Sequence, residues 1–114
     1  MKVFLVGATG VLGRAVVPRL LARGDDIVAL VRSLDRARPI DRPGVTLHEG
    51  DLLLEDPARF RRLLEDCDAA AHLATALRPG SPGLGTTNTN AALRTDGTKR
   101  LLDAVVAAGV SRIV

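Results

Sequence analysis

The stretch VFLVGATGVLG, residues 3–13, sets four apolar residues directly before three glycines that recur at every third position. An uninterrupted apolar run of this kind is typical of a parallel strand that is covered on both faces. Glycines that follow such a strand permit a tight turn, a close approach of a ligand to the backbone and close packing of the next helix. The stretch therefore predicts a strand, a glycine turn and a helix that begins at the turn.

Strand and helix signals alternate along the rest of the chain. We expect strands at residues 2–6, 26–31, 45–48, 68–73 and 111–114, and helices at 11–23, from Asp56-Pro57 onward and at about 90–108, with a short helix and loop at 33–43 and a mobile loop at 78–90. Repeated strand–helix units form parallel sheets through right-handed crossovers. The sequence therefore predicts an α/β fold, a doubly wound parallel sheet of the Rossmann type, in which residues 1–114 form one domain truncated at the fifth strand.

Each of the three longer helices has a face that we expect to be buried. The inward residues are expected to be Leu12, Val16 and Leu20 in the first helix, Phe60, Leu63 and Leu64 in the second, and Leu93, Gly97, Leu101 and Val105 in the third. Pro18 lies inside the first helix and should bend it. Gly97 is costly in a helix, so we expect it to allow close approach to a neighbouring element.

Composition narrows the function classes. The chain is 46% hydrophobic and 25% charged, its net charge is +3, and its arginines are interleaved with acids. Phe4 and Phe60 are the only aromatic residues, so a nucleic-acid partner, which usually needs stacking aromatics, is not expected. We expect no membrane partner, because no apolar run is long enough to span one. A single cysteine, Cys67, and the lack of a signal-peptide core favour the cytoplasm.

The glycine turn is predicted to hold a dinucleotide. A helix that starts at the carboxyl edge of a parallel sheet offers unpaired N–H groups and a dipole that attract phosphate. The residues expected to contact the pyrophosphate are Gly7, Ala8, Thr9, Gly10, Val11, Leu12 and Gly13. The alternative is a sharp strand–helix turn in an α/β domain that binds no nucleotide.

The end of the second predicted strand favours NADP over NAD. An NAD site usually has an acidic residue there to bind the ribose 2′-hydroxyl, whereas an NADP site has an arginine near the 2′-phosphate. This chain has Arg32 at that place, followed by Ser33, and Arg14 is a second candidate for the phosphate. Asp35 lies close enough in sequence to leave NAD open as the cofactor, and Arg32 could instead be a solvated surface residue.

These motifs together resemble a known family. GATGVLG (7–13), LVR (30–32), GDL (50–52), DAAAHLAT (68–75) and GTKRLLDAVVAAGVSRIV (97–114) make the chain similar to the N-terminal part of an extended or atypical short-chain dehydrogenase/reductase of the NAD-dependent epimerase/dehydratase family. The resemblance implies that Asp51 and Leu52 border the adenine and that Leu73, Ala74 and Thr75 run along the nicotinamide ribose. Asp51 could instead cap the turn after the third strand. The resemblance also implies that the helix at 90–108 lies near a homodimer interface.

The resemblance further implies hydride transfer by a Tyr-x-x-x-Lys pair with a Ser or Thr partner. This chain contains no tyrosine, and its two lysines stand elsewhere, so we expect no catalytic residue and no substrate-binding half within it. His48, His72 and Cys67 are interpreted as structural, with no metal partner. Arg94 replaces an asparagine that the family often has, which indicates an atypical branch.

The expected function is therefore the cofactor-binding part of an oxidoreductase, epimerase or dehydratase whose small-molecule substrate is unknown. The alternative is a non-catalytic module in which nucleotide binding serves as a sensor or drives assembly. A fifth strand at an exposed sheet edge also predicts marginal stability for these residues alone.

Overall fold

The computed structural model describes residues 1–74 and 93–114 as a five-stranded parallel sheet with helices on both faces. In chain order the elements are β1 (Lys2–Val6), α1 (Val11–Ala22), β2 (Asp26–Val31), the 3-10 turn η1 (Arg38–Ile40), β3 (Val45–Glu49), α2 (Pro57–Leu64), β4 (Ala69–His72), the π-helical turn η2 (Leu93–Gly97), α4 (Thr98–Ala108) and β5 (Arg112–Ile113). The predicted doubly wound α/β fold is confirmed. The predicted loop at 78–90 and the expected start of the last helix at about residue 90 lie outside the described residues.

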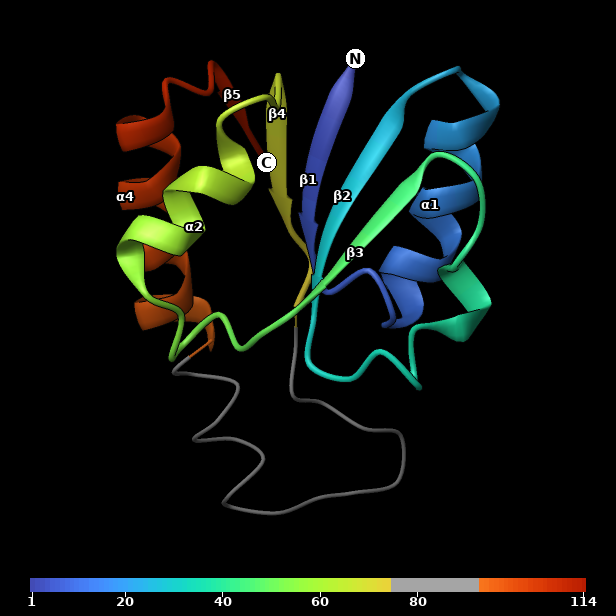
Figure 1. The fold of residues 1–114 in the computed structure, drawn as a ribbon, viewed down its shortest axis with the longest axis horizontal. Helices are drawn as coiled ribbons and strands as arrows, with labels where there is room; N and C mark the ends of the chain where they lie inside the picture. The colour runs from blue at the N-terminus through green and yellow to red at the C-terminus, as the bar shows by residue number, and fades with distance from the viewer. Residues whose placement is uncertain (75–92) are drawn as a thin grey trace.

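The order of the strands is β3-β2-β1-β4-β5 (Figure 1). The chain adds β2 and β3 on one side of β1 and then crosses to add β4 and β5 on the other side, so the strand order reverses at β1. In register, Val6 of β1 stands opposite Leu30 of β2 on one side and opposite His72 of β4 on the other. Ligands of open α/β sheets bind at the carboxyl ends of the strands where this reversal occurs. The topology therefore directs attention to the ends of β1 and β4.

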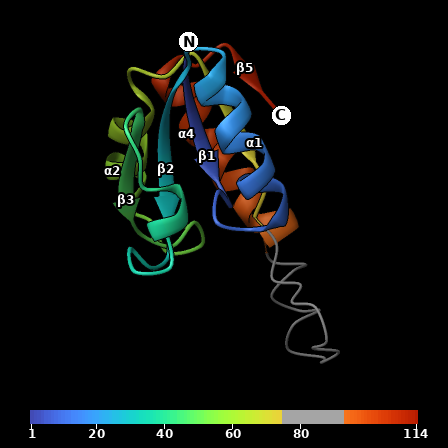
Figure 2. The ribbon, with the colours of Figure 1, turned by 90° about the vertical axis from the view of Figure 1, so that its right-hand side faces the viewer.

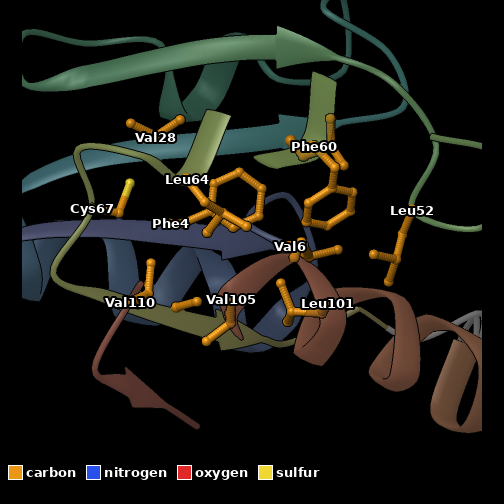
Figure 3. Close-up of a cluster of buried hydrophobic side chains, with 13 residues drawn as sticks. Phe4, Val6, Val28, Leu52, Phe60, Leu64, Cys67, Leu101, Val105 and Val110 are labelled. Carbon is orange, nitrogen blue, oxygen red and sulfur yellow. The ribbon is translucent and has the colours of Figure 1, made fainter. Parts of the chain in front are cut away.

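Side chains of β1 alternate between two hydrophobic cores. Phe4 and Val6 face α2 and α4, whereas Val3 and Leu5 face α1. Figure 2 shows α1 on one side of the sheet and α2 on the other. In the core beneath α2 and α4, the rings of Phe4 and Phe60 lie with their centroids 5.7 Å apart (Figure 3). This double covering explains why β1 and β2 are almost wholly apolar.

Two helices bury most of the residues that the sequence predicted, while the side chain of Leu93 lies outside the part that the structure describes. In α2, Phe60 and Leu64 are buried and Leu63 packs against them. In α4, Leu101 and Val105 are buried, and Gly97 at its start allows the close approach expected of it. A Cβ on Gly97 would come within 2.8 Å of a Leu52 methyl group.

The predicted buried face of α1 is only partly confirmed, since Leu20 packs against the core. Leu12 is 63% exposed, and the buried positions are Gly13 and Val17. The helix meets the sheet through Gly13, whose lack of a side chain lets the backbones approach. Hydrophobic periodicity carries no signal for a contact made by glycine, so the expected face was displaced by one position. The helix continues through Pro18 to Ala22.

Other differences concern the ends of elements. The fourth strand is shorter than expected, at Ala69–His72, and the fifth covers Arg112–Ile113. The short helix and loop expected at 33–43 are confirmed as η1 and the turns around it. Among the residues that the structure describes, no helix is both long enough and apolar enough to cross a membrane.

Candidate functional site

A cavity of about 460 Å³ opens at the carboxyl ends of the strands, where the sheet topology directs a ligand. It is lined by residues at the ends of β1 and β2 and in the turns that follow β1, β2, β3 and β4. Its lining residues are Val6, Gly7, Thr9, Gly10, Leu30, Val31, Arg32, Ser33, Arg36, Gly50, Asp51, Leu52, Leu73 and Ala74. Nine of the residues proposed from the sequence are among these fourteen.

The three glycines of the first turn meet three different structural demands. Gly7 has a φ of +88°, and a Cβ there would lie 2.3 Å from the backbone nitrogen of Ala74. A Cβ on Gly13 would lie 2.4 Å from the carbonyl oxygens of Gly7 and Ala8. At Gly10 the nearest protein atom would be 3.5 Å away, and Gly10 lines the cavity. The turn is therefore closed toward the protein at Gly7 and Gly13 and open toward the cavity at Gly10.

The amino-terminal end of α1 also faces this region. Gly10 is the N-cap of α1, with no side-chain cap and no acidic residue in the first turn. The first backbone N–H groups of the helix are therefore not paired by a capping side chain, and together with the helix dipole they favour an anion. The space at Gly10 and these N–H groups fit a phosphate group of a dinucleotide.

The remaining residues of the predicted turn do not line the cavity. Ala8 is buried in the core on the α1 side, and Val11 and Leu12 are exposed. The Arg14 guanidinium donates an Nε–H hydrogen bond to the Thr9 carbonyl oxygen at 3.1 Å. Arg14 thus stabilises the turn through this hydrogen bond and does not line the cavity.

The end of β2 brings cationic side chains to the cavity. Arg32, Ser33 and Arg36 all line it, and the Ser33 hydroxyl oxygen accepts a hydrogen bond from the Arg36 N–H at 3.4 Å. Asp35 does not line it, because its carboxylate is exposed and forms a salt bridge with Arg38 at 3.5 Å. Asp35, the acidic residue nearest in sequence to the end of β2, is therefore not positioned to bind a ribose hydroxyl in the cavity.

The sequence analysis missed one charged residue that lines the cavity, Arg36. The turn between Ser33 and Arg36 brings its side chain back to the end of β2. A second basic residue four positions after Arg32 was a usable signal, but only if that turn was foreseen. The other lining residues not predicted are Val6, Leu30, Val31 and Gly50.

The segment after β3 forms another wall of the cavity. Asp51 Oδ1 accepts a hydrogen bond from the Leu53 N–H at 2.9 Å, so this carboxylate caps its turn. Asp51 nevertheless lines the cavity, which leaves Oδ2 as its other acceptor. The two interpretations of Asp51 considered from the sequence are therefore compatible.

A salt bridge between Glu55 and Arg59 packs against this segment. The buried Glu55 carboxylate forms a salt bridge with Arg59, which also donates a hydrogen bond to the Glu49 carbonyl oxygen at 3.1 Å. A Cβ on Gly50 would collide with Glu55 Oε2 and would lie 3.0 Å from Arg59. Glycine at position 50 thus lets the pair pack against the segment that carries Asp51 and Leu52.

The exit of β4 forms the wall beside Gly7. Leu73 donates its N–H to the Val6 carbonyl oxygen at 2.7 Å, and both Leu73 and Ala74 line the cavity. Thr75, the third residue expected along the nicotinamide ribose, lies outside the described residues. The structure therefore brings Leu73 and Ala74 of this predicted set to the cavity.

Cys67 and the two histidines lie in strands of the sheet or just before one. Cys67 is buried, and burial raises the pKa of its thiol, which disfavours the nucleophilic thiolate. His48 lies in β3 opposite Leu30, and His72 Nδ1 accepts a hydrogen bond from the Ala74 N–H. In residues 1–74 and 93–114, no three His, Cys, Asp or Glu side chains gather as metal ligands would.

Comparison with known proteins agrees with this geometry. The sequence profile described as NAD(P)H-binding matches residues 7–114, almost the whole chain. The chain is 38% identical over its full length to 3-diazoavenalumate denitrifying reductase from Streptomyces sp., of which it spans 36%. It is 37% identical over 76 residues to photosystem II assembly factor Ycf39 from Synechocystis sp., covering 67% of this chain and 23% of that protein.

A solved structure extends the comparison to the fold. A short-chain dehydrogenase/reductase superfamily protein from Agrobacterium tumefaciens, solved with bound NAD, superimposes with a TM-score of 0.73 at 28% identity. The match covers 99% of this chain and 31% of that one, so the chain spans about a third of the length of such proteins. The glycine turn, the open cavity at the strand ends and these matches lead to one conclusion: the chain belongs to the NAD(P)H-binding family, and its resemblance to short-chain dehydrogenases/reductases is confirmed.

Proposed function

We propose that the cavity binds NADP(H) in preference to NAD(H). The observation that carries this proposal is the pair of arginines at the end of β2, since Arg32 and Arg36 both line the cavity. Asp51 is the one acidic residue among the described lining residues, and it follows β3 rather than β2. Two arginines with no acidic residue from the end of β2 beside them among the described lining residues suit a 2′-phosphate and give a ribose 2′-hydroxyl no carboxylate there to bind.

The other lining residues would divide the dinucleotide between them. The backbone from Gly7 to Gly13 would hold the pyrophosphate, with Gly10 providing the open space. Asp51 Oδ2 would accept a hydrogen bond from the adenine amino group, since Oδ1 is occupied by the Leu53 N–H. Leu73 and Ala74 would lie along the nicotinamide ribose, with Thr75 as the third predicted residue.

The whole protein is proposed to be an oxidoreductase, epimerase or dehydratase that works by hydride transfer. A nicotinamide cofactor supplies the hydride acceptor or donor in such chemistry. Residues 1–114 contain no tyrosine, so their contribution is to bind and orient the cofactor rather than to move a proton. We propose that they form one incomplete domain, which fits the third of the length that they span in their relatives.

Binding of reduced nucleotides to an Arg32→Asp variant tests the NADP preference. We expect NADPH affinity to fall roughly 10- to 100-fold, because a charge-assisted contact is replaced by repulsion, while NADH affinity changes little. Arg38→Asp is the matched control, because Arg38 is exposed and does not line the cavity. Fluorescence titration would measure both. Equal losses for NADPH and NADH would contradict the role of Arg32, and a chain that binds neither nucleotide saturably would overturn the proposal as a whole.

The similarity to an assembly factor favours one alternative, a module that binds nucleotide without catalysis. The coding sequence after codon 114 separates the two. A continuing frame with Tyr-x-x-x-Lys and a Ser or Thr partner supports the enzyme, whereas a stop at that codon removes it.

Partners and location remain part of the proposal. A homodimer through the helix at 90–108 is supported by Leu102 and Val106, which are 42% and 79% exposed on α4. The substrate is proposed to be a small molecule, and the cytoplasm is proposed as the location because of the single cysteine.

A further inference from the structure

The backbone that leaves β4 is held by a side chain of the strand itself. The ladder with β1 ends where Leu73 donates to the Val6 carbonyl oxygen. The next N–H group, that of Ala74, donates to His72 Nδ1 at 3.3 Å. This bond spans two residues and turns the chain immediately after the strand. It also makes Nδ1 an acceptor, so in the neutral ring the proton is on Nε2.

This turn lies against the first glycine of the dinucleotide motif. A Cβ on Gly7 would come within 2.3 Å of the Ala74 nitrogen and 2.4 Å of the Leu73 carbonyl carbon. Leu73, Ala74 and Gly7 all line the cavity. The position of the Ala74 N–H therefore decides how this wall meets the glycine turn.

The imidazole ring also lies close to Gly97 at the start of α4. A Cβ on Gly97 would lie 3.4 Å from His72 Nε2 and 2.8 Å from Leu52 Cδ2. The missing side chain at Gly97 thus lets the start of α4 close over both the histidine and Leu52, another lining residue. The ring that accepts from Ala74 therefore packs beside the start of α4.

We propose that His72 is a positioning residue for the cofactor, which holds the Leu73–Ala74 backbone against Gly7 at the nicotinamide-ribose end of the cavity. This inference rests on the proposed function, because it concerns one end of the proposed nucleotide site. His72 acts through Ala74 and needs no contact with the ligand. The opposite end, with Arg32 and Arg36, is independent of it.

Two amide variants of His72 separate positioning from general stability. In His72→Asn the side-chain oxygen can lie where Nδ1 lies, so it can still accept from Ala74. In His72→Gln the amide is one bond further out, near the place of Nε2, and the acceptor is lost. NADPH and 2′,5′-ADP are the probes, since 2′,5′-ADP lacks the nicotinamide half.

For His72→Gln we expect NADPH affinity to fall roughly two- to tenfold, the usual effect of one hydrogen bond, with 2′,5′-ADP affinity unchanged. His72→Asn should bind NADPH within about twofold of the unmodified chain. Amide hydrogen exchange at Ala74, measured without ligand, should be slow in the unmodified chain and in His72→Asn and fast in His72→Gln.

The results distinguish failure of the inference from failure of the proposed function. An unmodified chain that binds neither probe overturns both. Binding of both probes with an equal loss, or no loss, of the two affinities in His72→Gln overturns the role of His72 alone. If His72→Gln does not fold, unaltered Ala74 exchange and NADPH affinity in His72→Asn still support the acceptor role, and their loss contradicts it.

Discussion

Single atoms decide the turn after β1. Gly7 is required by its positive φ and by the backbone of Ala74, and Gly13 is required by the carbonyl groups of Gly7 and Ala8. Gly10 has no such neighbour within 3.5 Å. The same residue type thus serves the fold at two positions and leaves room for a ligand at the third.

Gly13→Ala is expected to destabilise the fold. Its Cβ would meet backbone atoms at 2.4 Å, which cannot move as a flexible side chain can. We expect a loss of roughly 2–3 kcal/mol, larger than the roughly 1 kcal/mol that alanine gains in helix propensity. Thermal unfolding should show a melting temperature lower by roughly 10 °C or more.

Gly10→Ala is the matched comparison for that substitution. Its melting temperature should remain close to that of the unmodified chain, while its NADPH affinity falls because the added methyl group occupies ligand space. If the Gly13→Ala chain has the same melting temperature as the unmodified protein, α1 does not depend on the close contact of Gly13 with the backbone of Gly7 and Ala8.

At the scale of elements, residues next to one another in the sequence determine where α2 begins. Asp56 is the N-cap of α2, its carboxylate accepts from the Arg59 N–H at 3.2 Å, and Pro57 fills the first helical position. The start of α2 predicted from Asp56-Pro57 is therefore confirmed. Since α2 carries Phe60 and Leu64 into the core, its first turn bears on the packing against β1.

Asp56→Ala should cost about 1 kcal/mol of stability, the usual effect of losing an N-cap. Asp56→Asn keeps a capping oxygen and should lie within a few tenths of a kcal/mol of the unmodified chain. Urea unfolding of the two variants measures the difference. Equal midpoints for Asp56→Ala and Asp56→Asn would mean that the cap does not stabilise α2.

Elements whose signals are local were predicted well, and the features that were missed depend on tertiary packing. The apolar runs predicted β1 and β2, and the position of β4 in the alternating pattern predicted a strand in spite of its alanines. The buried face of α1 was partly missed because Gly13 makes the contact. Arg36 was missed because only the turn at Ser33 brings it to the cavity. The roles of the lining residues toward a ligand remain predictions.

For the molecule as a whole, the sheet has β3 at one edge and β5 at the other. Within the described residues β5 is paired with β4 alone, and both its residues are exposed. The central strands are enclosed on both faces and both sides, so stability is concentrated around β1. The marginal stability expected from the sequence remains a prediction, which thermal unfolding tests.

The 114-residue chain is expected to unfold below about 60 °C as a monomer and to be stabilised by NADPH. A ligand that binds only the folded state adds about 2.7 kcal/mol at a concentration 100 times its Kd. Differential scanning calorimetry over a series of NADPH concentrations should show a rising melting temperature, and Arg32→Asp should need far more NADPH for the same rise. A monomer that unfolds reversibly well above 60 °C without ligand would contradict the expected marginality.

The order of strands also sets when a newly made chain can first be useful. Of these five strands β1 is synthesised first, yet its second neighbour, β4, is not complete until His72 has been added. Until then one side of the central strand has no partner, and the wall of Leu73 and Ala74 beside Gly7 does not exist. If Leu73 and Ala74 bind the cofactor as proposed, the glycine loop is synthesised well before the site is complete, and we expect nucleotide binding only after translation has passed β4.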